Sequence, residues 1–397
     1  MDRLSLKDLR EQLPVTEEVG YFQTGTYGPT LSSAVKAVTG AMEYEALHGP
    51  ARPDTRQYIM EKEEAARGHL ADLLNVNPEE IGIGSNTTRA MHRVLRSFDW
   101  GEGDEFVTTS LEHVSTAAAS RGLEQERGVT VKVVEVDESD AAFIESLDGT
   151  VTEETKLLLI SHVASPNGRI MPVREAVDVA HEKGVPVLVD AAQSVGQIPV
   201  DAQALGCDFL IGSGPKWLLG PMGSGYVWVS PDQSDTFRPY FTPDVGAWSK
   251  PGAPVATPTA RSRAEFGTYN HPLVIGLGQA VKTLMSVGLE TIQDCVAGLS
   301  KPLREEMQDT PGVNVITPME PGKSAGVTTL TFDGYAEEDM QGLVQWLNDE
   351  RNILVKAQWL TAPLQLDKIG MRISVAGFNT EEEVQHLIDS IRDGIRR

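Results

Sequence analysis

The chain has 397 residues, carries a formal net charge of −23, and is 40% hydrophobic. This length suffices for two or three domains, or for one large α/β unit with an accessory lobe. The negative charge argues against surfaces that bind nucleic acid or anionic membranes. No apolar run reaches the roughly 20 residues of a membrane span. With only two cysteines, a disulfide framework and a multi-cysteine zinc site are excluded.

The N-terminus, "MDRLSLKDLREQLP", is polar from its first residues and has no apolar signal core. We therefore expect a cytoplasmic protein with no membrane partner. The sequence holds 13 lysines and 21 arginines beside 57 acidic residues. An acidic surplus with few lysines favours adaptation to a salt-rich (halophilic) cytoplasm, and an ordinary acidic enzyme is the alternative.

Residues 60–230 alternate short apolar runs with amphipathic stretches. The runs are rich in Val, Ile and Leu and are bounded by turn residues, which predicts buried strands covered by helices on both faces of a mostly parallel sheet. Helical periodicity is clear in "TTRAMHRVLRSF" and "VREAVDVAHEKG". The expected strands are "EEIGIGS", "DEFVTTS", "VTVKVVEV", "TKLLLISH", "VPVLVDAA", "CDFLIGS" and "SGYVWVS".

After residue 230 the pattern changes. Residues 241–268 are rich in Pro, Gly and Thr and predict an extended loop, and residues 271–308 predict one long helical stretch. Strands at 326–332, 352–358 and 370–376 and helices at 337–351 and 379–395 complete an α+β lobe. We expect an N-terminal segment, 1–20, packed on this lobe, a large α/β domain, 21–265, and a small C-terminal domain, 266–397.

Three of the expected strands end in polar residues that could carry chemistry. The polar start of a helix collects anions such as phosphate through its free N–H groups, although a plain helix cap is the alternative for such a sequence. A carboxylate after a buried strand is either a cap or a buried charge that needs a cation. The three ends are Ser85-Asn86-Thr87-Thr88, Asp190 with Gln193, and Ser213 with Lys216.

Ligands of open α/β sheets bind beyond the carboxyl ends of the strands, where these groups would meet. Pyridoxal 5′-phosphate requires a lysine that binds it covalently, a carboxylate for its pyridine nitrogen and a phosphate site. Lys216, Asp190 and the segment 85–88 match those three requirements. Covalent attachment would also remove the cost of burying the charge of the lysine.

The spans "DAAQSVGQIPVDAQALGCDFLIGSGPKWLLGPMGSGYVWV", "TTSLEHVSTAAAS", "SHVASPNGRIMPV" and "MRISVAGFNTEEEV" resemble the class V aminotransferase family. That family includes cysteine desulfurases, cysteine/cystine C–S lyases and isopenicillin N epimerase-like enzymes. The resemblance runs from residue 21 to the final helix. It implies fold type I of the pyridoxal phosphate-dependent transferases, an amino acid substrate, and a homodimer with shared active sites.

The resemblance also implies roles for individual residues. Lys216 would carry the cofactor and move the α-proton, and Asp190 would pair with the pyridine nitrogen. His113 would stack on the ring, a helix cap being the alternative, and Arg372 would bind the substrate α-carboxylate, with a surface strand arginine as the alternative. The remaining expected cofactor contacts are Gln193 and Asn167 at the ring oxygen, Thr87, Thr88 and Ser213 at the phosphate, and Gly267 and Thr268 lent by the neighbouring subunit.

Two of these positions carry qualifications. Asn167 precedes a glycine, so a simple Asn-Gly turn is an equal alternative. Many family members carry His where this chain has Pro215, so a cofactor contact made by that His is lost here. No metal ligands are expected.

Desulfurases of the family carry a nucleophilic cysteine shortly before the carboxylate-binding arginine. The corresponding residues here, 352–372, contain none, because the two cysteines are Cys207 and Cys295. We therefore expect a C–S lyase that acts on cysteine or cystine by α,β-elimination. The alternatives are an aminotransferase or amino acid epimerase, then a cysteine desulfurase or selenocysteine lyase, and last a non-catalytic binding protein.

Overall fold

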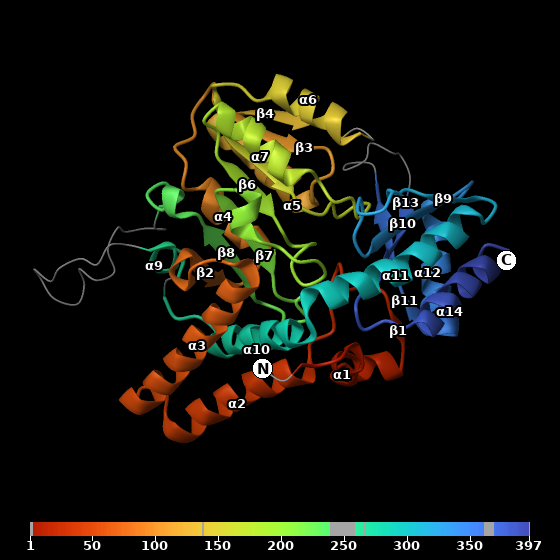
Figure 1. The fold of residues 1–397 in the computed structure, drawn as a ribbon, viewed down its shortest axis with the longest axis horizontal. Coiled ribbons are helices and arrows are strands. Elements are labelled where there is room, and N and C mark those ends of the chain that lie inside the picture. The colour runs from red at the N-terminus through yellow and green to blue at the C-terminus, as the bar shows by residue number, and fades with distance from the viewer. Residues whose placement is uncertain (1–2, 137–138, 239–258, 266, 361–368, 397) are drawn as a thin grey trace, which may run out of the picture.

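The computed structural model describes residues 3–136, 139–238, 259–265, 267–360 and 369–396, and these form a large lobe and a smaller one side by side (Figure 1). The large lobe is built on a seven-stranded sheet in the order β2-β8-β7-β6-β5-β3-β4. Its strands are β2 (Ile81–Gly84), β3 (Glu105–Thr109), β4 (Thr130–Val134), β5 (Thr155–Ser161), β6 (Val187–Asp190), β7 (Phe209–Ser213) and β8 (Gly225–Val229).

The five strands from β7 to β4 are parallel, whereas β8 runs antiparallel to both β7 and β2. All seven runs expected from the sequence are strands, and the mostly parallel α/β sheet is confirmed. Strands buried on both faces read as continuous apolar runs, which is why the sequence marked them so clearly.

Helices cover both faces of this sheet, and alternate residues of β5 show the division. Leu158 and Ile160 belong to one hydrophobic core, and Leu157 and Leu159 belong to another on the opposite face. The first core includes residues of α3 (Pro53–Leu74), α6 (Asp140–Thr150), α7 (Val173–Glu182), α8 (Ala202–Leu205) and α10 (His271–Val287). The second includes residues of α4 (Thr87–Leu95), α5 (Val114–Arg127) and α9 (Ala260–Ala264).

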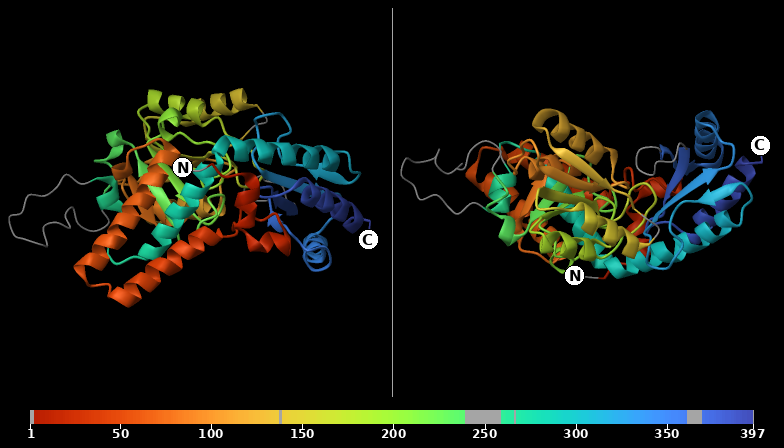
Figure 2. Two further views of the ribbon diagram at one scale, coloured as in Figure 1. Left: turned by 60° about the horizontal axis from the view of Figure 1, so that its bottom comes forward. Right: turned by 90° about the horizontal axis from the view of Figure 1, so that it is seen from above.

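Helices α2 (Ser32–His48) and α3 form a long hairpin that projects from the body, as Figure 2 shows. Helix α10 packs against both of them. The stretch 271–308 was expected to be helical, and it is helical apart from one bend. It is two helices, α10 and α11 (Leu289–Gln308), bent by 75° at Gly288, whose φ of +97° lies in the region that favours glycine.

The smaller lobe has a four-stranded antiparallel sheet in the order β12-β13-β10-β9. Helices α11, α12 (Glu337–Arg351) and α14 (Glu381–Gly394) enclose its core. The strands are β9 (Val313–Val315), β10 (Val327–Phe332), β12 (Lys356–Trp359) and β13 (Ile369–Ser374), and a separate pair joins β1 (Gly20–Tyr21) to β11 (Ile353–Leu354). The expected strand at 352–358 is thus divided between β11 and β12.

Helix α1 (Leu6–Glu11) touches both lobes. Its Arg10 donates hydrogen bonds to the Phe378 carbonyl and the Glu383 carboxylate, whereas Leu9 belongs to the core of the large lobe. Because α10 packs against α2 and α3, we propose a division between the lobes at Gly288 rather than at residue 265.

Two further expectations concern other parts of the chain. Of the expected loop 241–268, residues 241–258 and 266 lie outside the described residues, and Ala260–Ala264 forms the short helix α9. Within the described ranges, no single helix has the length and apolar composition of a membrane span; only the bent pair α10–α11 meets both measures together.

Candidate active site

A cavity of about 440 Å³ opens where the carboxyl ends of β5, β6 and β7 face the smaller lobe. Side chains from both lobes and from the segment after β1 line it, so it is assembled by the tertiary fold rather than by one motif. The lining residues are Gly25, Thr26, Tyr27, Ser85, Asn86, Thr87, Thr88, His113, Ser115, Ser161, Val163, Ser165, Asp190, Ala192, Gln193, Ser213, Pro215, Lys216, Met222, Gly223, Lys356 and Arg372.

Lys216 follows the end of β7 by three residues. Its amine forms no hydrogen bond or ion pair with the described residues. Burial lowers its pKa to about 8, opposed by the negative charge of Asp190 and assisted by the positive charges of Arg372 and Lys356. Because this pKa lies near neutrality, the Lys216 amine is uncharged in a substantial fraction of molecules at neutral pH. An uncharged amine can act as a nucleophile and can accept a proton.

Gly28 packs directly against the backbone of this lysine. Its N–H donates to the Pro215 carbonyl at 2.7 Å, and a Cβ at position 28 would lie 2.3 Å from the Lys216 carbonyl oxygen. No side chain fits in that space. The glycine therefore lets the N-terminal segment reach the lysine loop.

Asp190 ends β6 and is buried. Its Oδ1 accepts a hydrogen bond from the Ala192 N–H at 2.9 Å. Burial raises its pKa, and the positive charge of Lys216 opposes that rise. The carboxylate thus sits in the cavity wall where a cationic group of a ligand would stabilise it.

Glu112 lies behind Asp190 and was not expected from the sequence. Its carboxylate accepts hydrogen bonds from the Thr109 hydroxyl at 2.8 Å and from the N–H and hydroxyl of Ser161 at 2.9 and 2.6 Å. Ser161 pairs in register with Asp190 across β5 and β6. Complete burial raises the pKa of Glu112 to about 7, despite the three hydrogen bonds and with a small addition from Asp190. Its position next to His113 was the available sequence signal.

His113 lines the cavity and is the N-cap of α5. Its Nδ1 accepts from the Ser115 N–H at 3.2 Å, which leaves the ring proton on Nε2. Loss of solvent, with the positive charges of Lys216, Arg372 and Lys356, lowers its pKa to about 4. His113 is thus a helix cap, as the alternative expected, and it also lines the cavity; its stacking on a cofactor ring stays a prediction.

The N-terminus of α4 forms another part of the wall. Asn86 caps the helix by accepting from the Arg89 N–H at 2.9 Å, and Thr87 and Thr88 begin its first turn. The Ser85 and Thr87 hydroxyl oxygens are buried and have no hydrogen-bond partner among the described residues. Unpaired donors at a helix N-terminus match an anionic group such as phosphate.

Arg372 projects from the middle of β13 and is buried. One Nη donates to the Ser165 hydroxyl at 3.1 Å and the other to the Thr26 hydroxyl, while Nε has no partner in the described structure. Burial lowers its pKa to about 10, so it keeps its charge at neutral pH. A buried guanidinium without a carboxylate partner is ready for an external one.

Gln193 and Asn167 differ in their placement. Gln193 lines the cavity, where its Nε2 donates to the Gly25 carbonyl at 2.9 Å and to the Ser165 hydroxyl at 3.3 Å. Asn167 does not line the cavity, and its Oδ1 accepts from the Arg169 N–H at 3.2 Å. The geometry thus favours the Asn-Gly turn for Asn167.

Neither Gly267 nor Thr268 is among the residues that line the cavity of Lys216. They are exposed, and Thr268 lines a neighbouring cavity of about 630 Å³ beside α4. The pair Arg67–Glu265, with N–O distances of 2.7 and 2.9 Å, holds the chain just before them.

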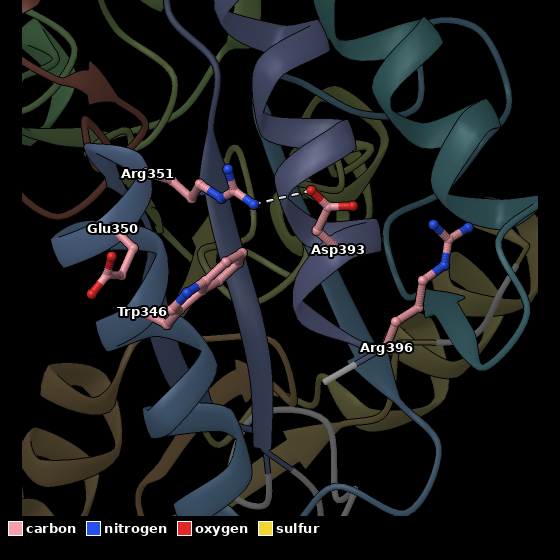
Figure 3. Close-up of a pocket in the computed structure, with 5 residues that line it drawn as sticks. All are labelled: Trp346, Glu350, Arg351, Asp393 and Arg396. Atoms are coloured by element: carbon pink, nitrogen blue, oxygen red, sulfur yellow. Dashed lines mark hydrogen bonds and ion pairs between the residues drawn. The ribbon is translucent and has the colours of Figure 1, made fainter.

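A further hollow lies on the smaller lobe between α12 and α14, shown in Figure 3. There the Arg351 guanidinium lies 4.8 Å from the centre of the Trp346 ring and 3.0 Å from an Asp393 oxygen. Arg351 is thus engaged by Asp393 and Trp346, and we assign no second candidate site to this hollow.

The cavity residues fit pyridoxal 5′-phosphate. Lys216 offers a free amine, Asp190 a buried carboxylate, and Ser85 and Thr87 offer unpaired hydroxyls. The residues that the sequence did not indicate are Thr26, Ser165 and Lys356, besides Glu112. Thr26, Ser165 and Lys356 have no local motif, because strand register and lobe packing bring them to the cavity.

Neither cysteine reaches this cavity. Cys207 is buried in the core just before β7, and burial raises the pKa of its thiol. Cys295 lies on α11, where burial also raises the pKa of the thiol. Both thiols are therefore protonated at neutral pH and separated from the site.

Comparison with known proteins matches residues 31–387 to the model of the family described as Aminotransferase class-V. The chain is 29% identical to a cysteine desulfurase of Cronobacter sakazakii and 27% identical to a probable cysteine desulfurase of Methanothermobacter thermautotrophicus, with at least 97% of each chain covered. Its fold matches C-DES, a cystine C–S lyase, in complex with cysteine persulfide, with a TM-score of 0.87 and 26% identity over 96% of this chain and 99% of the other. A C-DES variant with glycine covalently linked to its PLP cofactor gives a TM-score of 0.87, also at 26% identity, over 97% of this chain and 99% of the other.

Proposed function

The chain belongs to the class V aminotransferase family and is a pyridoxal 5′-phosphate-dependent enzyme of fold type I, and we propose that it breaks the Cβ–S bond of cysteine or cystine by α,β-elimination. The observation that carries this proposal is the position of the two cysteines. A desulfurase must move sulfur onto its own thiol, but Cys207 is in the core and Cys295 is on α11. An elimination needs no protein thiol.

Pyridoxal 5′-phosphate, when bound, supplies an electron sink for negative charge at the substrate α-carbon. Lys216 would carry it, Asp190 would hold the charge of its ring nitrogen, and Thr87, Thr88 and Ser213 with the orphan Ser85 hydroxyl would hold its phosphate. Gln193 would donate to the oxygen on the cofactor ring in place of its longer hydrogen bond to Ser165. His113 would cover the face of the cofactor ring.

Arg372 would bind the substrate α-carboxylate through its guanidinium, in the bidentate geometry that this group favours. The α-proton passes to Nζ of Lys216, which the low pKa of that amine permits. The Cβ–S electron pair leaves with the sulfur, and one water then releases pyruvate and ammonia. With cysteine the sulfur product is sulfide, and with cystine it is cysteine persulfide.

The double variant Cys207→Ala, Cys295→Ala tests this assignment. It should still convert cysteine or cystine to pyruvate and a sulfur product, because neither thiol takes part. Loss of packing at buried Cys207 could lower stability by about 1 kcal/mol, so the melting temperature is measured beside the activity.

The identity of the product decides between reactions. Alanine as the main product of the wild type, lost in the double variant, would contradict the elimination and establish a desulfurase. Amino transfer to a keto acid without sulfur release would establish an aminotransferase instead. Lys216→Ala is the inactive control.

The homodimer is part of the same proposal. Gly267 and Thr268 are exposed and do not line the cavity of Lys216 in their own chain, which is consistent with residues lent to a partner. Sedimentation of the holoenzyme should give a mass of twice the 43.1 kDa chain. A monomer that retains its cofactor would contradict shared sites. The cytoplasmic location stays a prediction.

A further inference from the structure

A second cation lies beside Arg372 in the cavity wall. Strands β12 and β13 pair antiparallel with Lys356 directly opposite Arg372. Residues directly opposite one another in such a pair project from the same face of the sheet with their Cβ atoms about 5 Å apart. Both side chains line the cavity that contains Lys216.

The Lys356 amine has no anionic partner in the described part of the chain. No hydrogen bond or ion pair joins it to another residue there, and like charges directly opposite in a sheet destabilise it. Partial burial and the positive charge of Arg372 lower the pKa of Lys356. The direction of this shift agrees with an unfavourable interaction between the two like charges. An anion bound between or beside the two cations would offset that cost.

The anions already assigned do not meet this requirement. In the proposed function the cofactor phosphate lies at the N-terminus of α4, on the large lobe, and the substrate α-carboxylate lies at Arg372. Among the described lining residues Asp190 has the one carboxylate, which in the proposed function would pair with the cofactor nitrogen, and Glu112 is enclosed by Thr109 and Ser161. The positive charge of Lys356 therefore has no anionic partner in the proposed function.

We propose that Lys356 binds a second carboxylate, carried at the side-chain end of the substrate. This inference rests on the proposed function, in which Arg372 holds the α-carboxylate. It selects among the substrates named there, because cystine carries a carboxylate on its distal half and cysteine does not. Lys356 is thus a specificity-determining residue that favours amino acids with a second acidic group.

The test compares two inhibitors of equal length on the holoenzyme. Succinate and butyrate both have four carbons, but only succinate has a second carboxylate. In the wild type, succinate should bind at least about tenfold more tightly than butyrate, the contribution of one charge-assisted hydrogen bond. In Lys356→Gln this ratio should fall to near one, whereas Lys356→Arg should keep it.

Lys301→Gln is the matched control, because Lys301 is an exposed lysine of the same lobe and pairs with Glu305. It should leave the ratio unchanged. Butyrate should bind Lys356→Gln as it binds the wild type, which shows that Arg372 is intact. The melting temperature of Lys356→Gln should not fall, since the change removes a like-charge contact.

Two results would overturn the proposal. One is a succinate-to-butyrate ratio that Lys356→Gln leaves unchanged. The other is a loss of pyridoxal phosphate affinity in the apoprotein of that variant, which would assign Lys356 to the cofactor phosphate. Inhibitor binding does not depend on which product forms, so this proposal and the elimination reaction can fail separately.

Discussion

Glu112 gives the sharpest prediction about the physics of the site, because a carboxyl group is buried there among neutral partners. Replacing it by glutamine keeps its shape. The side-chain carbonyl can still accept from the Ser161 N–H, and the amide can donate to the Ser161 hydroxyl. What the change removes is the ability to ionise.

The folded-state pKa of Glu112 is raised from 4.5 to about 7 by burial. A raised pKa means that the folded state prefers the protonated form. Its contribution to stability is therefore fully present below pH 4.5 and is lost as the pH rises through 7. With about 1.4 kcal/mol for each pKa unit, the loss reaches about 3 kcal/mol.

The assay is urea unfolding of the apoprotein from pH 4 to pH 8, for the wild type and for Glu112→Gln. The difference between their unfolding free energies should change by about 3 kcal/mol in favour of the variant as the pH rises. Asp190, His113 and His162 titrate in both proteins, so their contributions cancel to first order. Glu124→Gln, an exposed change on α5, is the control and should show no such trend. A difference that stays flat from pH 4 to pH 8 would refute the reasoning, since the pKa of Glu112 would then be the same in the folded and unfolded states.

Two further predictions follow from the site and from the charge. Asp190→Asn should keep the fold and bind the cofactor but lower turnover by orders of magnitude, because the ring nitrogen loses its anionic partner; an unchanged turnover would make Asp190 structural. The melting temperature of the holoenzyme should rise with salt, because a net charge of −23 repels itself over a Debye length of about 10 Å at 0.1 M but only about 3 Å at 1 M. A flat profile would remove the argument for salt adaptation.

The large sheet was predictable because each of its strands is a short apolar run with turn residues at both ends. The break between α10 and α11 was not. Gly288 follows an apolar run without proline, and an isolated glycine is tolerated inside a helix. Only the packing of α10 on α2 and α3 and of α11 on the smaller lobe requires the bend.

The same distinction applies to the site. Asp190, Ser213 and Lys216 follow strand ends, which the sequence displays, and the topology brings them together. Lys356 could not be found in that way. Its position depends on the register of β12 against β13, and one residue of slip would point it to the other face.

Residues 23–28 contact both lobes at the cavity and hold them in place relative to each other. Gln23 donates to the Val355 carbonyl at 2.6 Å on the smaller lobe, and the Gly25 carbonyl accepts from Gln193 at 2.9 Å on the large lobe. Thr26 accepts from Arg372, and Gly28 packs on the lysine loop. This segment therefore sets the spacing between the Arg372 guanidinium and the Lys216 amine. A change in it should alter substrate affinity and turnover together, because both depend on the placement of Arg372 relative to Lys216.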